Sequence, residues 1–230
     1  MSALIADMIG IITGPAAAIA RAMEAKRWKA LLAVILLVTA AVTFVTFPVT
    51  KADQARMIRD SEMADKLSDE QLASLEGFTP FQRVMGAVTA MFFAALALAL
   101  SAFFVYLFYK VGGGEGLYVN YFAAVTQASV LDMVLGGVLK GALVLLKRSM
   151  LVQTGLTLFF PGLDFRSLPF IALSQFDFFS LWFLAALALG IAAYSKMAPR
   201  KSFVIAALYF LFKSLILVAL SYFSMKLMGM

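Results

Sequence analysis

The sequence contains no cysteine and no histidine. Without cysteine the chain can form no disulfide bond, thiolate metal site or thiol nucleophile. Without histidine it has no imidazole metal ligand and no Ser-His catalytic pair. It also lacks the side chain that most readily exchanges protons near neutral pH. The remaining residues form no pattern typical of a catalytic centre, so we expect a protein that is not an enzyme and that binds no metal or cofactor.

Charged residues are scarce as well, at 14% of the chain, whereas hydrophobic residues make up 63%. Soluble domains contain about a quarter charged and about half apolar residues. A chain of 230 residues is too small to hide several wholly apolar helices in a water-soluble core. The sequence therefore predicts an all-α, polytopic integral membrane protein. Its net charge of +6 indicates membrane topology and attraction to anionic lipid rather than nucleic-acid binding.

The apolar runs predict a bundle of five transmembrane helices, which makes residues 30–230 a membrane domain. The expected spans cover about residues 30–48, 83–109, 121–146, 177–195 and 202–225. Residues 49–80 form the one long polar stretch, and we expect them to be an external loop. Residues 151–173 are interrupted by Pro161-Gly162 and Pro169, so they are expected to be interfacial or re-entrant rather than a sixth span.

Basic residues gather at two places that indicate the orientation of the chain. Because cytoplasmic loops carry the excess of lysine and arginine, both clusters predict a cytoplasmic N-terminus and, with five spans, an external C-terminus. The first cluster precedes the first span, and the second lies in the turn between the last two spans: Arg21, Lys26, Arg27 and Lys29, then Lys196, Arg200 and Lys201.

Residues 1–29 are expected to form a cytoplasmic segment that contains one short helix. Pro15 followed by an alanine-rich run is a typical helix start, and it predicts a helix over residues 15–27. We expect this helix to lie on the membrane surface with its basic residues facing anionic lipid or a protein partner. An N-terminal extension of the first span is an equally good interpretation.

Two charges fall within the expected spans at similar depth. Asp132 on the third span and Lys213 on the fifth each lie about 15 Å from the cytoplasmic end of their helix. A charge at that depth costs at least about 2.5–3.5 kcal/mol, so the two are expected to pair. Lys140 lies about 12 Å beyond Asp132, and we expect it to extend outward rather than to pair with Asp132. Gln127 and Asp177 are further polar candidates.

The last two expected spans carry a characteristic order of residues. It comprises Asp177-Phe178-Phe179, Leu181-Trp182, Gly190 and the turn Ala198-Pro199-Arg200-Lys201. With Ile12-Thr13-Gly14-Pro15 ahead of the first span and the five-span layout, the sequence resembles the YIP family, the Ypt/Rab-interacting membrane proteins and their prokaryotic relatives. The resemblance covers about residues 11–222.

The resemblance implies a five-helix integral membrane protein with a cytoplasmic N-terminus. Eukaryotic members work in vesicle traffic between the endoplasmic reticulum and the Golgi and bind Rab-type GTPases. This chain has Ile-Thr-Gly-Pro where those members have Asp-Leu-Tyr-Gly-Pro, so binding of a Rab-type GTPase is not expected. It looks like a prokaryotic member, which implies a location in the bacterial inner (plasma) membrane.

Two functions stay open on the sequence alone. The first is a non-enzymatic protein that organises membranes, as in trafficking, by binding lipid, protein partners or a second copy of itself. The second is a transporter or channel for a small ion or a lipid, built around Asp132 and Lys213. A dry and fully packed interior would favour the first function, whereas water-filled access to Asp132 would favour the second.

Overall fold

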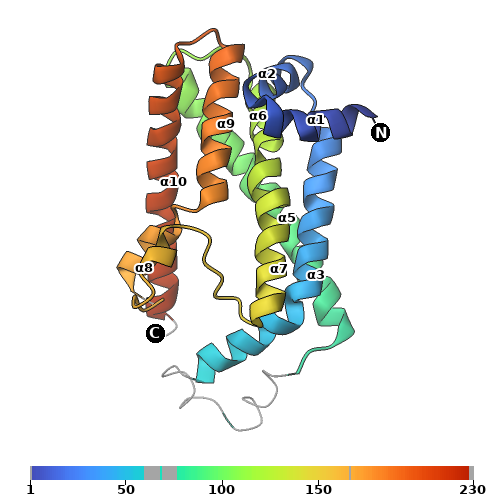
Figure 1. Cartoon of the computed structure of the whole chain (residues 1–230), viewed down its shortest axis with the longest axis vertical. Helices are drawn as coiled ribbons and strands as arrows, with labels where there is room; N and C mark the ends of the chain where they lie inside the picture. The colour runs from blue at the N-terminus through green and yellow to red at the C-terminus, as the bar shows by residue number, and fades with distance from the viewer. Residues whose placement is uncertain (1, 60–67, 69–76, 166, 228–230) are drawn as a thin grey trace.

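The computed structural model describes residues 2–59, 68, 77–165 and 167–227, and in these parts the chain forms helices and no strand (Figure 1). The result confirms the expected all-α membrane bundle. The helices in chain order are α1 (Ser2–Thr13), α2 (Pro15–Ala25), α3 (Lys29–Arg59), α5 (Pro80–Val111), α6 (Tyr118–Ser129), the π-helix η2 (Val130–Gly136), α7 (Gly137–Lys147), the 3-10 helix η3 (Leu156–Phe159), α8 (Leu168–Ser174), α9 (Phe178–Tyr194) and α10 (Pro199–Leu227).

Four helical segments of the described chain are long and apolar enough to cross a bilayer. They have mean hydropathies of 1.9 to 2.6, and α9 is a shorter fifth apolar helix of 17 residues. Their outer faces expose large apolar side chains: Phe92, Phe93 and Leu215 are 65%, 59% and 70% exposed. Such surfaces are rare on soluble monomers and are suited to lipid. The four segments are Lys29–Arg59, Pro80–Val111, Tyr118–Lys147 and Pro199–Ser224.

The elements that run along the bundle are α3, α5, α6 with α7, α9 and α10, and the two ends of the chain lie at opposite ends of the molecule (Figure 1). We call the end that carries α1, α2 and the turn at residues 195–198 the N-terminal end. Both basic clusters lie at this end, because α3 and α10 begin there. The other end carries α8 and the last residues of α10.

At 17 residues α9 is only about 25 Å long, which is less than a hydrocarbon core of about 30 Å.

Helix α3 does not end at Pro48, where the first span was expected to stop. It continues to Arg59 and bends in its last part (Figure 1). Proline removes one backbone donor, which leaves the carbonyl of Phe44 without its helical partner. The Nε of Arg83 on α5 donates to that carbonyl at 2.7 Å. Residues 49–59 of the expected external loop are therefore helical, and residues 60–67 and 69–76 of it lie outside the described chain.

The expected surface helix is α2, and one of its faces is buried in the bundle. Its apolar stripe of Ala18, Ile19, Ala22 and Met23 packs against α6 and α9. At Gly190 of α9 an added Cβ would collide with the Ile19 side chain, so glycine allows this close approach. Arg21 on α2 stays exposed, as do Lys26 and Arg27 just beyond its end. Helix α1, and not α2 alone, covers the N-terminal end, and it lies across the bundle axis (Figure 1).

Candidate functional site

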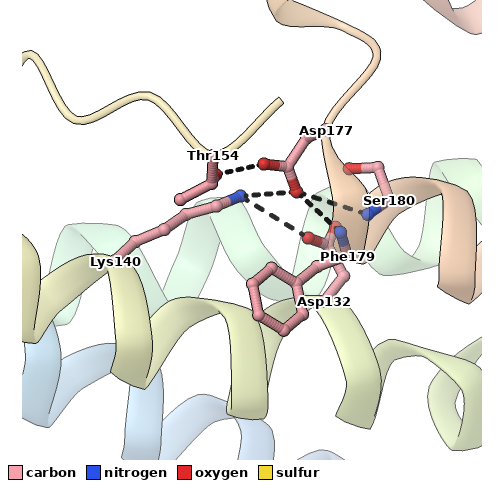
Figure 2. Close-up of polar contacts among 6 residues, drawn as sticks. All are labelled: Asp132, Lys140, Thr154, Asp177, Phe179 and Ser180. Atoms are coloured by element: carbon pink, nitrogen blue, oxygen red, sulfur yellow. Dashed lines mark hydrogen bonds and ion pairs between the residues drawn. The ribbon is translucent and has the colours of Figure 1, made fainter. Parts of the chain in front are cut away.

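Lys140 on α7 lies between two carboxylates inside the bundle (Figure 2). Its Nζ is 3.1 Å from Oδ1 of Asp177 and 3.9 Å from Oδ1 of Asp132. The side chains of Lys140, Asp132 and Asp177 are 35%, 28% and 10% exposed. We call these three residues the ionic cluster. It joins α7, η2 and the start of α9, and Asp177 is its most buried member.

The contact between Lys140 and Asp132 corrects the expectation that Lys140 extends outward. In a regular α-helix, residues eight positions apart lie about 80° apart around the axis. The π-helix η2 intervenes, and its i to i+5 bonding places more residues in each turn, which brings the two side chains onto one face. A helical side chain also points toward the N-terminus of its helix, so Lys140 reaches back toward Asp132. Gly136 completes the arrangement, because an added Cβ would come within 2.8 Å of the Phe179 ring.

Asp177 fixes the start of α9. Its Oδ1 accepts from the backbone N–H groups of Phe179 and Ser180 at 3.0 and 3.4 Å, as an N-cap residue does. Its Oδ2 accepts from the hydroxyl of Thr154 (Figure 2). A single antiparallel bridge pairs Gly155 with Asp177, and an added Cβ on Gly155 would lie 2.9 Å from the Asp177 Cα. The carboxylate thus ties the segment after α7 to α9.

Lys213 is half-buried on α10 and makes no hydrogen bond or ion pair with any residue that the structure describes. Its charge still interacts with that of Asp132, but the direct contact of Asp132 is with Lys140. Gln127 is buried and lies elsewhere on α6, where its Nε2 donates to the main-chain oxygen of Asp7 on α1 at 2.7 Å. Its Oε1 has no partner among the described residues. Of the five polar candidates within the spans, the structure gathers Asp132, Lys140 and Asp177.

A pocket of about 250 Å³ reaches the ionic cluster from the segment that follows α7. Its lining includes Lys140, Asp177, Thr154 and Ser174 but not Asp132. Toward the N-terminal end the cluster is followed by tightly packed apolar residues. Leu131, Leu187 and Ile191 are all 0% exposed, and they belong to the same core as Tyr109 and Tyr121. The pocket therefore reaches the cluster at Lys140 and Asp177, and buried apolar residues follow the cluster toward the N-terminal end.

The basic residues expected to face lipid or a partner lie at the N-terminal end and are all exposed. The guanidinium of Arg21 lies beside α1, 3.8 Å from the position of a Cβ on Gly10. Lys26 and Arg27 follow in the turn between α2 and α3, and Lys29 is the first residue of α3. The ammonium of Lys29 lies 5.8 Å from the ring centroid of Trp28.

A family model of the Yip1 domain matches residues 9–221, which include the ionic cluster and all four of these basic residues. The chain belongs to the Yip1 family. No curated protein and no solved structure matches it. Yip1-domain proteins form a non-enzymatic family of membrane proteins, in agreement with the apolar outer faces of the helices.

Two polar residues of this Yip1 domain were not among the sequence-based candidates. Thr154 lies in the interrupted segment 151–173, where the polar triplet Gln153-Thr154-Gly155 was the one available signal. Asp53 lies beyond Pro48, within the expected external loop. Its carboxylate accepts from the backbone N–H of Met150 at 2.6 Å and from the hydroxyl of Ser149 at 2.9 Å. Asp53 thus joins the end of α3 to the turn that follows α7.

Proposed function

We propose that this Yip1-domain protein is a non-enzymatic membrane-organising protein that acts at the N-terminal end of its bundle. In this proposal α1 enters one leaflet of the bilayer as a wedge, and protein partners or a second copy are recruited at the same end. The ionic cluster holds the fold and does not carry ions. The Rab-type GTPase of eukaryotic members is not part of the proposal, because the sequence ahead of the first span differs from theirs.

The observation that carries the proposal is the exposed apolar face of α1. Ile5, Ile9 and Ile12 follow one another at spacings of four and three, and they are 49%, 54% and 46% exposed. The opposite side of α1 is anchored, since Ile11 is fully buried and Gln127 bonds to the main chain of Asp7. A helix that lies across the bundle with an apolar face typically sits at the boundary between headgroups and acyl chains.

We propose that the N-terminal end faces the cytoplasm of a bacterial cell and that the protein resides in the inner membrane. The gathering of both basic clusters at this end supports the orientation. A reporter enzyme fused after residue 230 is then expected to be active outside the cytoplasm, and a cytoplasmic signal from that fusion would reverse the orientation.

Vesicle shape provides the test of the wedge. Purified protein reconstituted into vesicles of zwitterionic and anionic lipid is expected to reduce the mean vesicle diameter or to form tubules in electron cryomicrographs. Replacing Ile5, Ile9 and Ile12 by serine removes the apolar face and should abolish most of this change. The matched variant with leucine at the three positions keeps the face and should behave like the unmodified protein.

The wedge proposal fails if the serine variant, shown to keep the thermal stability of the bundle, shapes vesicles as well as the leucine variant does. The transporter alternative is favoured by one observation, the pocket that reaches Lys140 and Asp177. Against it stands the buried apolar core between the ionic cluster and the N-terminal end, which includes Leu131, Leu187 and Ile191.

A further inference from the structure

The turn between α2 and α3 forms a pocket of about 330 Å³ next to α1. Its lining consists of Asp7 on α1 and residues 26–31, which include Lys26, Arg27 and Lys29. The fourth basic residue of the segment, Arg21, does not line it. The pocket therefore divides the N-terminal basic cluster into three residues that converge on one space and one that lies outside it.

The three cations of the pocket are unpaired within the described chain. Lys26, Arg27 and Lys29 make no ion pair with any described carboxylate, although Asp7 lies in the same wall. The pocket thus carries three positive charges against one negative charge. Because an isolated cluster of like charges repels itself, an anionic ligand would relieve the repulsion.

The shape of the pocket is fixed by contacts with the rest of the bundle. Lys26 adopts the left-handed conformation at φ 52°, where its backbone N–H caps α2. Nδ2 of Asn120 on α6 donates a hydrogen bond to the main-chain carbonyl of Met23 at 2.8 Å. The indole of Trp28 packs edge-on against Phe122 at 5.1 Å between ring centroids, and Leu31 is buried. A ligand would therefore meet a preformed site and would not have to order the turn.

We propose that this pocket binds the phosphate-bearing headgroup of one anionic phospholipid. The proposal rests on the proposed function in one respect, because it needs the N-terminal end to lie at the membrane surface. An arginine and two lysines suit a phosphate, and a tryptophan is typical of the headgroup level. The first residues of α3 line the pocket, and Leu37 farther along that helix is 64% exposed. The acyl chains of the bound lipid would run along this outer face of α3.

A fluorescence measurement tests this assignment, because the chain contains only two tryptophans. Trp182→Phe leaves Trp28 as the one emitter, in the wall of the pocket. The full-length protein is reconstituted with lipids brominated near the glycerol end of the acyl chain, either anionic phosphatidylglycerol or zwitterionic phosphatidylcholine at the same mole fraction. Quenching of Trp28 should show that the anionic lipid is enriched next to Trp28 by about fivefold or more over the zwitterionic lipid. This is the factor that one basic residue near an anionic surface supplies.

Three variants sharpen the measurement. The pocket variant combines Lys26→Gln, Arg27→Gln and Lys29→Gln. Its enrichment of the anionic lipid should fall to about one. The matched control removes three charges from the same end outside the pocket, by Arg21→Gln, Lys196→Gln and Arg200→Gln, and should keep most of the enrichment. Asp7→Asn removes the one opposing charge and should raise it, a gain that loss of folding cannot imitate.

The assignment is overturned if the pocket variant keeps its enrichment, if the control variant loses as much, or if Asp7→Asn gives no gain. A saturable change of Trp28 fluorescence on adding micromolar inorganic phosphate in detergent would assign the pocket to a soluble ligand instead. These outcomes are separate from the proposed function, because the isoleucine variants of α1 keep all three pocket cations.

Discussion

Lys140→Met is expected to lower the free energy of unfolding by about 3 kcal/mol, the lower end of the range for breaking a buried ion pair. The substitution leaves Asp132 and Asp177 close together with no cation between them, and Asp177 is only 10% exposed. The lower end of the range applies because the Lys140 side chain is 35% exposed. Unfolding by sodium dodecyl sulfate in mixed micelles, followed by tryptophan fluorescence, measures the change.

Lys213→Met is the matched control for this substitution. It removes a second lysine from the interior of the bundle, but one that makes no hydrogen bond or ion pair with the described residues. We expect a change of less than about 1 kcal/mol or a slight gain, because the cost of burying this charge offsets its electrostatic interaction with Asp132. If Lys213→Met destabilises the protein as much as Lys140→Met, then the arrangement of charges described above is incorrect.

Asp177→Ala should have an effect of similar size, at about 3 kcal/mol, because one carboxylate holds several groups. The change removes the N-cap of α9, which is typically worth about 1 kcal/mol, together with the charge-assisted bond to Lys140. It also leaves the hydroxyl of Thr154 without its acceptor. We expect the segment around Thr154 to detach from α9, which hydrogen exchange of the purified protein would report as faster exchange at residues 150–157.

Asp177→Asn separates the cap from the charge. Asparagine is as good an N-cap as aspartate, so this variant should lose only about half of what Asp177→Ala loses. Asp132→Asn should cost less still, since Asp132 lies farther from Lys140 at 3.9 Å and is more exposed. If Asp132→Asn instead lowers the stability more than Asp177→Asn does, then the ionic cluster stabilises η2 rather than the start of α9.

The fold followed from the sequence where local signals decide it. The fourth span was expected at residues 177–195, and α9 covers Phe178–Tyr194, because the Asp177 cap and the basic turn mark both of its ends. The continuation of α3 through Pro48 to Arg59 is not evident from the sequence. This continuation depends on Arg83, which lies 39 positions from Phe44 in the chain and supplies the missing donor. No local pattern contains that contact.

The site was harder to predict, because depth along a helix does not give direction around it. The rise per residue places Asp132 and Lys213 at matched heights and predicts two charged residues of the bundle interior. It did not include the π-helix η2, which turns Asp132 toward Lys140. It also could not show that the segment after α7 returns into the bundle, where Thr154 meets Asp177.

Ion flux in proteoliposomes tests most directly the claim that these charges hold the fold and do not conduct. Vesicles loaded with a pH-sensitive or a sodium-sensitive dye are compared with protein-free vesicles after a proton, sodium or potassium gradient is imposed. The packed core beyond Leu131, Leu187 and Ile191 predicts the same flux in both. A protein-dependent flux that Asp132→Asn abolishes, in a variant that folds normally, would contradict the account and assign the ionic cluster to transport.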